Sequence, residues 1–147
     1  MKLTWRPLTG VSASDFTPPI IIGDDSLPRG PGMKFILSAP RSFAWAVQTA
    51  EAVRRSEVES FDRANLRTTF SAIVQCVFRT ADECRQFLDD LALDLGSIRK
   101  GDLIIDYTQG GSRKLTGVLQ SVEAQDQTGA SCVITYTWLG GAISRNT

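Results

Sequence analysis

The chain of 147 residues contains no histidine. This absence excludes Ser-His-Asp and Cys-His catalysis, imidazole metal ligation and a histidine pH switch. Cysteine is scarce too, and the three residues Cys76, Cys84 and Cys132 show no CxxC spacing. An odd, sparse count does not make a disulfide framework, so we expect buried, reduced and inert thiols.

An excess of charge of one sign is also lacking, because 16 Lys and Arg balance 16 Asp and Glu. Free nucleic-acid binding usually needs a basic excess, whereas zero net charge favours self-association. No apolar run approaches the roughly 18 residues of a membrane span. Residues 1–7 hold no apolar signal-peptide core. We therefore expect neither a membrane nor a specific nucleic acid as a partner.

Proline is crowded into residues 1–32, which hold five of the six prolines. Proline lacks an amide donor and fixes φ, so neither a long helix nor a central strand is expected there. The segment also carries large apolar side chains, which a flexible tether does not need. We expect an extended arm that docks on a neighbouring subunit, with a peripheral strand that closes the chain's own core as the open alternative. The candidate interface residues are Trp5, Phe16, Ile20, Ile21 and Ile22.

Two segments carry clear periodic patterns. Over residues 68–80 apolar and smaller side chains alternate, with Phe70 and Cys76 on one face, which predicts a half-buried strand. Residues 80–95 begin with Thr80 and Glu83 in capping-box spacing. Apolar residues then recur at steps of three and four, and Gly96 follows. This pattern predicts a capped helix with one apolar face.

The remaining segments predict short strands. Residues 33–37, 102–107, 114–124 and 130–139 are strand candidates, and the last three are joined by Gly-containing turns typical of antiparallel hairpins. Residues 43–64 fit either two strands with a turn near 49–52 or a helix, and we favour the strands. Residues 142–147 are expected to be a frayed tail. The chain is thus predicted to be one mostly β domain of the α+β class over residues 33–141, preceded by the arm.

No set of side chains in the sequence points to catalysis. Asp89 and Asp90 are adjacent on the predicted helix and diverge by about a hundred degrees. Asp102 and Asp106 lie about 13 Å apart along a strand, which is too wide for a pair of glycosidase carboxylates. Glycine pairs occur without a phosphate-binding motif. We expect no enzyme, no cofactor and no metal site.

The order of elements resembles that of small tail components of tailed bacteriophages. It runs from the strand Phe70–Phe78 through the capped helix and Gly101–Ile105 to Leu115–Val122 and Val133–Gly141. It is similar to the tail-tube-type fold, an antiparallel β-sandwich or half-barrel flanked by one helix, which tube, distal-tail and baseplate-hub proteins share. The resemblance covers residues 33–141 and brings no signature residue for a functional site.

This resemblance implies a structural virion protein, assembled in the host bacterial cytoplasm. Copies would form a ring in the phage tail, at the distal tail or baseplate, beside other tail proteins. A neck or tail-completion protein is one alternative. A bacterial ligand-binding or adaptor domain unrelated to virions is another, and an enzyme that uses carboxylates alone is a third.

Overall fold

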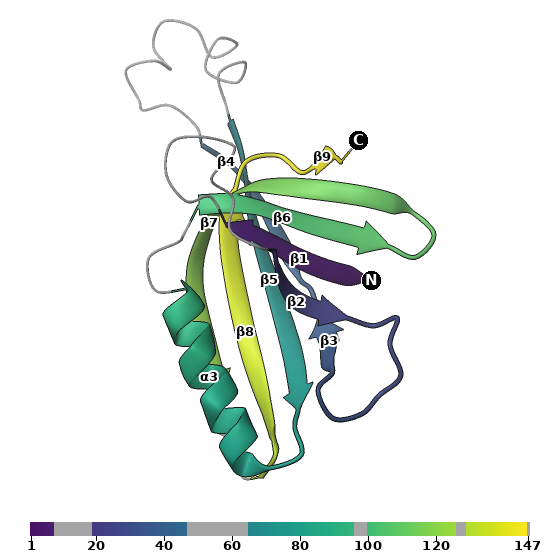
Figure 1. Cartoon of the computed structure of the whole chain (residues 1–147). Coiled ribbons are helices and arrows are strands. Elements are labelled where there is room, and N and C mark those ends of the chain that lie inside the picture. Colours follow the sequence, from purple (N-terminus) through teal and green to yellow (C-terminus); the bar gives the residue numbers. More distant parts are fainter. Residues whose placement is uncertain (8–18, 47–64, 96–99, 126–128, 147) are drawn as a thin grey trace, which may run out of the picture.

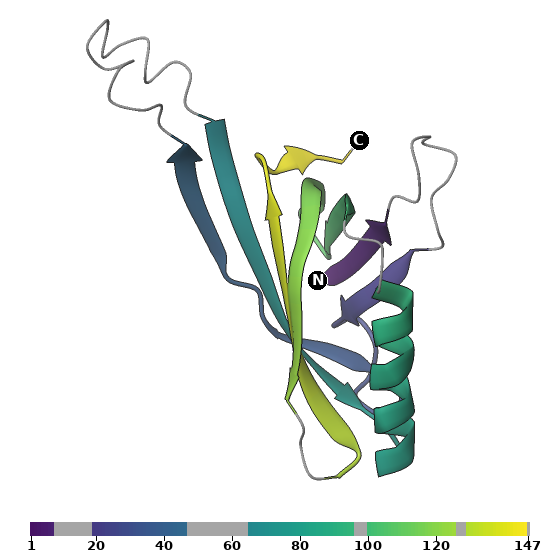
Figure 2. The same ribbon diagram turned by 90° about the vertical axis from the view of Figure 1, so that its left-hand side faces the viewer.

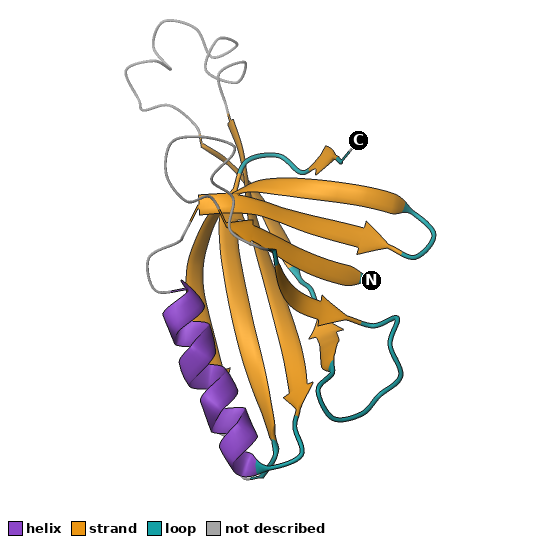
Figure 3. Cartoon of the chain, viewed as in Figure 1, coloured by secondary structure: helices purple, strands orange, loops and turns teal. Residues whose placement is uncertain are grey.

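A computed structural model describes residues 1–7, 19–46, 65–95, 100–125 and 129–146. These residues form nine strands and one helix (Figures 1 and 3). The elements in chain order are β1 (Lys2–Pro7), β2 (Ile20–Asp24), β3 (Lys34–Ser38), β4 (Arg41–Ala46), β5 (Asn65–Val77), α3 (Ala81–Leu95), β6 (Lys100–Tyr107), β7 (Gly111–Gln125), β8 (Ser131–Gly140) and β9 (Ser144–Arg145).

All described strands belong to one antiparallel sheet in the order β2-β1-β6-β7-β8-β5-β3, with β4 paired to β5 and β9 to β7. The sheet curls so far that β2 and β3, at its two ends, come together. Lys34 Nζ donates to the carbonyl of Ile21 over 3.0 Å, and Ile36 N–H donates to Asp25 Oδ1 over 2.9 Å. Of the two architectures expected, the half-barrel flanked by one helix is confirmed.

The core is built from strand alternation, as predicted. On β5 the side chains of Phe70, Ala72, Val74 and Cys76 are buried, and those between them are only partly covered. The register pairs Phe70 with Trp138 and Cys76 with Cys132, so β8 alternates in step. The curled sheet therefore has a filled inner face and a half-exposed outer face.

Helix α3 covers part of this inner face (Figure 1). Glu83 N–H donates to Thr80 Oγ1 over 3.2 Å, so Thr80 caps the helix as predicted. Glu83 reaches back to the N–H of Arg79 rather than to that of Thr80. Leu91 and Cys84 enter the core. The predicted packing of the apolar helix face on the sheet is confirmed.

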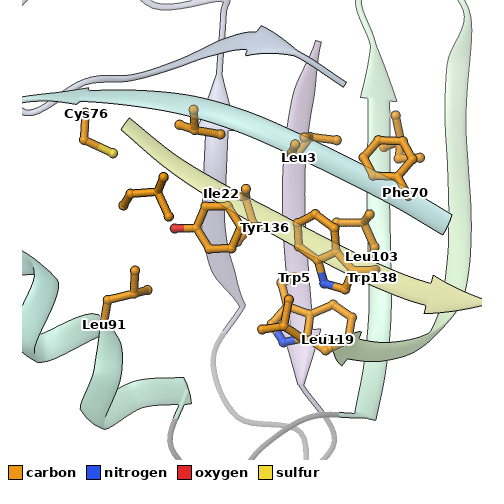
Figure 4. Close-up of a cluster of buried hydrophobic side chains, with 14 of the residues drawn as sticks. Leu3, Trp5, Ile22, Phe70, Cys76, Leu91, Leu103, Leu119, Tyr136 and Trp138 are labelled. Carbon is orange, nitrogen blue, oxygen red and sulfur yellow. The ribbon is translucent and has the colours of Figure 1, made fainter. Parts of the chain in front are cut away.

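Aromatic rings fill the centre of the core (Figure 4). Trp138 stacks on Tyr136 with 5.6 Å between ring centroids and an interplanar angle of 11°. Trp138 also contacts Trp5 and Phe70 at 6.1 and 6.0 Å. These four residues come from β1, β5 and β8, so the two ends of the chain meet in one cluster.

A row of glycines crosses three neighbouring strands. Gly101 on β6 pairs with Gly117 on β7, which pairs with Gly140 on β8. A Cβ at Gly117 would collide with the backbone of Leu139, and one at Gly101 with the backbone of Arg6. Adjacent backbones therefore approach here more closely than any side chain allows, which permits the tight curl of the sheet.

The structure corrects the expectation of an extended arm for residues 2–7 and 20–24, which are strands of the chain's own sheet. Strand β1 lies inside the sheet, between β2 and β6. Proline does not interrupt it, because Pro7 is its last residue. The alternative expectation, peripheral strands that close the chain's own core, is the one that residues 2–7 and 20–24 fulfil. The domain therefore begins at β1 and not at residue 33.

Two smaller expectations are also settled in part. The tail 142–147 is not wholly frayed, because Ser144 and Arg145 pair with β7 and Asn146 N–H donates to Ser112 O over 3.1 Å. Within 43–64, the first predicted strand exists as part of β4. The turn expected near residues 49–52 lies outside the described residues.

Candidate functional site

Strand β4 and the start of β5 form a ribbon, the β4–β5 ribbon (residues 41–46 and 65–70). Pairing of β8 with β5 ends where Gly140 faces Thr68, whereas β4 continues along β5 to Asn65. The outer part of the ribbon, residues 44–46 and 65–67, therefore projects beyond the end of β8 and away from α3 (Figure 2). This placement follows from the unequal lengths of β5 and β8.

The ribbon exposes large aromatic side chains. Trp45 is 62% exposed and Phe43 is 50% exposed. They lie opposite Leu66 and Thr68, on the same face of the sheet as the buried core. Aromatic residues with this degree of exposure are typical of interaction surfaces and are the commonest anchors of protein interfaces. The ribbon is the strongest candidate for a functional surface in the described part of the chain.

Arg41 fixes the base of the ribbon. Its guanidinium lies over the ring of Phe70, 4.7 Å from the centroid. The same group donates to Tyr107 Oη over 2.7 Å and to the carbonyl of Ala39 over 3.1 Å. Ser71 N–H donates to Pro40 O over 3.0 Å, which continues the pairing from β3 into β4. The ribbon is thus held at its base on both strands.

Three buried polar atoms near this base lack hydrogen-bond partners in the described part of the chain. They are Trp5 Nε1, Trp138 Nε1 and Thr68 Oγ1. Thr68 is the first residue of β5, in chain order, that pairs with β8, and it is diagonal to Trp138. Buried polar groups without hydrogen-bond partners cost free energy. Hydrogen bonding in the core is therefore least complete where the ribbon begins.

The three cysteines are all free and buried, as expected. Cys76 and Cys132 face each other across β5 and β8, and Cys84 joins the same core from α3. Burial raises the pKa of the Cys76 thiol to about 11 and raises that of Cys132 as well. Because the thiolate is the reactive form, both thiols are poor nucleophiles. Burial also lowers the pKa of nearby Lys34, whose ammonium group lies 4.8 Å from the ring centroid of Phe87.

The carboxylates do not converge. Asp89 and Asp90 are both exposed on α3. Asp102 accepts a hydrogen bond from Thr116 Oγ1 over 2.7 Å. Asp24 accepts one from Ser26 Oγ over 2.6 Å, which lowers its pKa. Within the described ranges, no group of three or more Cys, Asp or Glu side chains is placed to hold a metal ion. The one described helix, α3, is not long and apolar enough to cross a membrane.

The predicted interface residues do not form one surface. Trp5 and Ile22 are fully buried in their own domain, and Ile20 packs against the same core. Ile21 remains 46% exposed, while Phe16 lies outside the described residues. The apolar side chains of β1 and β2 therefore serve mainly the chain's own core. In β1 buried and more exposed residues alternate, and in β2 Ile22 is buried whereas Ile21 is exposed.

Sequence reasoning missed the ribbon aromatics. Phe43 and Trp45 alternate with small residues, and this alternation is the pattern that favours a strand at the start of residues 43–64. Alternation predicts that two side chains share a face, but it does not say whether a neighbouring element covers that face. Both residues lie on β4 at the edge of the described sheet, and no local pattern encodes that position. No family model, curated protein or solved structure matches this chain.

Proposed function

We propose that this chain is a structural, non-enzymatic subunit of a tailed-phage tail, where copies assemble into a ring at the distal tail or baseplate. The observation that carries the proposal is the β4–β5 ribbon, which presents Phe43 and Trp45 beyond a core that is otherwise filled. Exposing two large aromatic rings is unfavourable for an isolated chain, so a partner that covers them is expected.

The architecture agrees with the sequence resemblance. A curled antiparallel half-barrel with one flanking helix is the fold that the resemblance to phage tail components implies. Ring assembly needs a heterologous contact, in which one surface of a subunit meets a different surface of the next. A projecting ribbon suits such a contact because it reaches past its own domain.

The proposal is tested first by location. Phage particles from a strain that carries the gene should contain the chain in purified tails, and antibodies against it should label the tail end in electron micrographs. A chain that is expressed but absent from purified particles would refute the virion role.

The ribbon is tested by substitution in the phage gene. The double variant Phe43→Ser/Trp45→Ser should fold but fail to enter tails, because the aromatic contact is lost. Leu93→Ser is the matched control, since Leu93 is 80% exposed and belongs to α3, not to either strand of the ribbon. Equal incorporation of both variants would mean that assembly uses another surface.

A further inference from the structure

We propose that two copies of the free chain pair antiparallel along the outer edge of β4, with Ala44 opposite Ala44 and Phe43 opposite Trp45 of the second copy. The pairing extends two β4–β5 ribbons into one four-stranded sheet about a two-fold axis. This inference does not rest on the phage-tail role, because it concerns the chain in solution.

The edge of β4 is open for a specific reason. Strands β3 and β4 lie end to end along β5, and together they form one edge of the sheet. The outer side of β3 is covered, because Ile36 N–H donates to Asp25 Oδ1 and Lys34 Nζ reaches Ile21 O on β2. Among the described residues, β5 is the one strand that pairs with β4. The backbone groups on the outer side of β4 are therefore available to another strand.

Strand β4 carries little of the usual protection of an edge. Edge strands are normally guarded by lysines, prolines, bulges or charges that prevent pairing with another chain. The sequence from Arg41 to Ala46 has one charged residue and no proline, and its pairing with β5 has no bulge. The charge of Arg41 is directed inward, to Phe70 and Tyr107, rather than along the edge.

The occupant of such an edge must itself be an extended strand, because its backbone has to supply the matching donors and acceptors. A second β4 meets this need and is self-complementary. In an antiparallel pair centred on Ala44, the residue before Ala44 in one copy lies opposite the residue after Ala44 in the other. Phe43 of each copy therefore faces Trp45 of the other copy. Directly opposite aromatic residues stabilise a strand pair. Shifting the centre to Phe43 places Trp45 against Arg41 and leaves one aromatic pair, Phe43 with Phe43, in place of two.

Charge does not oppose this pairing. The chain has zero formal net charge, so two copies do not repel each other over long distances. In the register centred on Ala44, the two Arg41 positions lie about 20 Å apart along the strands at about 3.3 Å per residue. That separation exceeds the Debye length of about 8 Å at physiological ionic strength. The contact between the two strands is therefore apolar at its centre.

Cysteine cross-linking tests directly which residues of the two β4 strands lie opposite each other. Ala44→Cys places one thiol of each copy at the two-fold axis, within the reach of a disulfide. Ser42→Cys is the matched control, because it adds a thiol to the same exposed strand two residues from the axis. The three native cysteines are buried and contribute little background. With dilute oxidised glutathione, we expect Ala44→Cys to form covalent dimers at least tenfold faster than Ser42→Cys.

Sedimentation of the unmodified chain supplies the second measurement. We expect a monomer–dimer equilibrium that depends on concentration and that Phe43→Ser/Trp45→Ser shifts at least tenfold toward monomer, with an unchanged circular dichroism spectrum. A monomer at all concentrations, or equal cross-linking of the two cysteine variants, would overturn the pairing. Ring-sized particles in which Ala44→Cys does not cross-link would overturn it too, yet leave the phage-tail role standing. A chain that forms the cross-linked dimer but is absent from phage particles would support the pairing and refute the phage-tail role.

Discussion

The guanidinium of Arg41 donates a 2.7 Å hydrogen bond to the phenol of Tyr107 and so joins β4 to β6. In the sheet these strands are separated by β5, β8 and β7, so the bond spans the curl instead of following it. Arg41 also covers the ring of Phe70, which belongs to the core. One side chain thus links the ribbon, the core and the far side of the half-barrel.

Removing this link should cost a modest amount of stability. Tyr107→Phe deletes the hydrogen bond alone and is expected to lower the free energy of unfolding by about 0.5–1.5 kcal/mol. Arg41→Ala should cost more, because it also removes the contact with the Phe70 ring. Urea unfolding of the two single variants and the double variant measures the coupling. Strictly additive losses would show that the two side chains do not interact.

Leu91 should be a closed core position on α3. Leu91→Ala is expected to lower the free energy of unfolding by about 2–5 kcal/mol, because it leaves a cavity among buried side chains. Leu93→Ala, on the exposed side of the same helix, serves as the control and should be nearly neutral. Similar small effects at both positions would place the apolar face of the helix away from the core.

Gly117 should tolerate no side chain. A Cβ there meets the backbone of Leu139 on β8, which has no flexible end that could give way. Gly117→Ala is therefore expected to cost at least about 1–3 kcal/mol. The control is Gly30→Ala, where an added Cβ meets nothing within 4 Å. Thermal unfolding that ranks the two variants equally would refute the role of the glycine row in the curl.

Thr68→Val should increase stability. The hydroxyl of Thr68 is buried without a hydrogen-bond partner, and valine has almost the same shape without that polar atom. We expect the free energy of unfolding to rise by about 1 kcal/mol, since the desolvation cost of the hydroxyl disappears. Thr69→Val, on the outer face of β5, should change it less. Destabilisation by Thr68→Val would mean that the hydroxyl has a partner after all.

Alkaline pH should destabilise the fold. Burial raises the pKa of Cys76 from 9.0 to about 11, and it raises the pKa of Cys132 and of Tyr136 too. The unfolded chain then releases protons that the folded chain retains, so this stabilisation is complete below about pH 9 and is lost as the pH rises. The lowered pKa of Lys34 acts in the opposite direction, but it concerns one group, whereas three groups have raised pKa values.

Reversible urea unfolding between pH 8 and pH 11 tests this expectation. The free energy of unfolding should fall steadily above about pH 9, and Tyr136→Phe should make the fall less steep above about pH 10, where an unfolded tyrosine titrates. A free energy of unfolding that does not change over this range would contradict the burial of these groups.

The sequence predicted those parts of the fold that depend on patterns of neighbouring residues. The alternation around Phe70 and Cys76 gave the correct faces of β5, and Thr80 marked the start of α3. Both signals depend on neighbours within a few residues. The half-barrel itself was expected from the order of elements rather than from any single pattern.

The features that were missed depend on partners far along the chain. Trp5 was expected at an interface, but β6 and β2 enclose its strand from both sides. Cys76, Cys84 and Cys132 were each expected to be buried, yet nothing local shows that they meet in one core. Likewise, Phe43 and Trp45 are exposed on β4, the strand that pairs with β5 at the edge of the described sheet, and this position depends on the pairing of distant segments.

The glycine row also limits how this chain can vary. Apolar core positions accept other apolar side chains of similar volume, so they drift readily between related sequences. Gly101 and Gly117 have no such freedom, because the obstacle to a Cβ is the backbone of the adjacent strand. A distant relative that keeps the same curl should therefore be recognised by its glycines, in register across three strands, long after its apolar residues have changed.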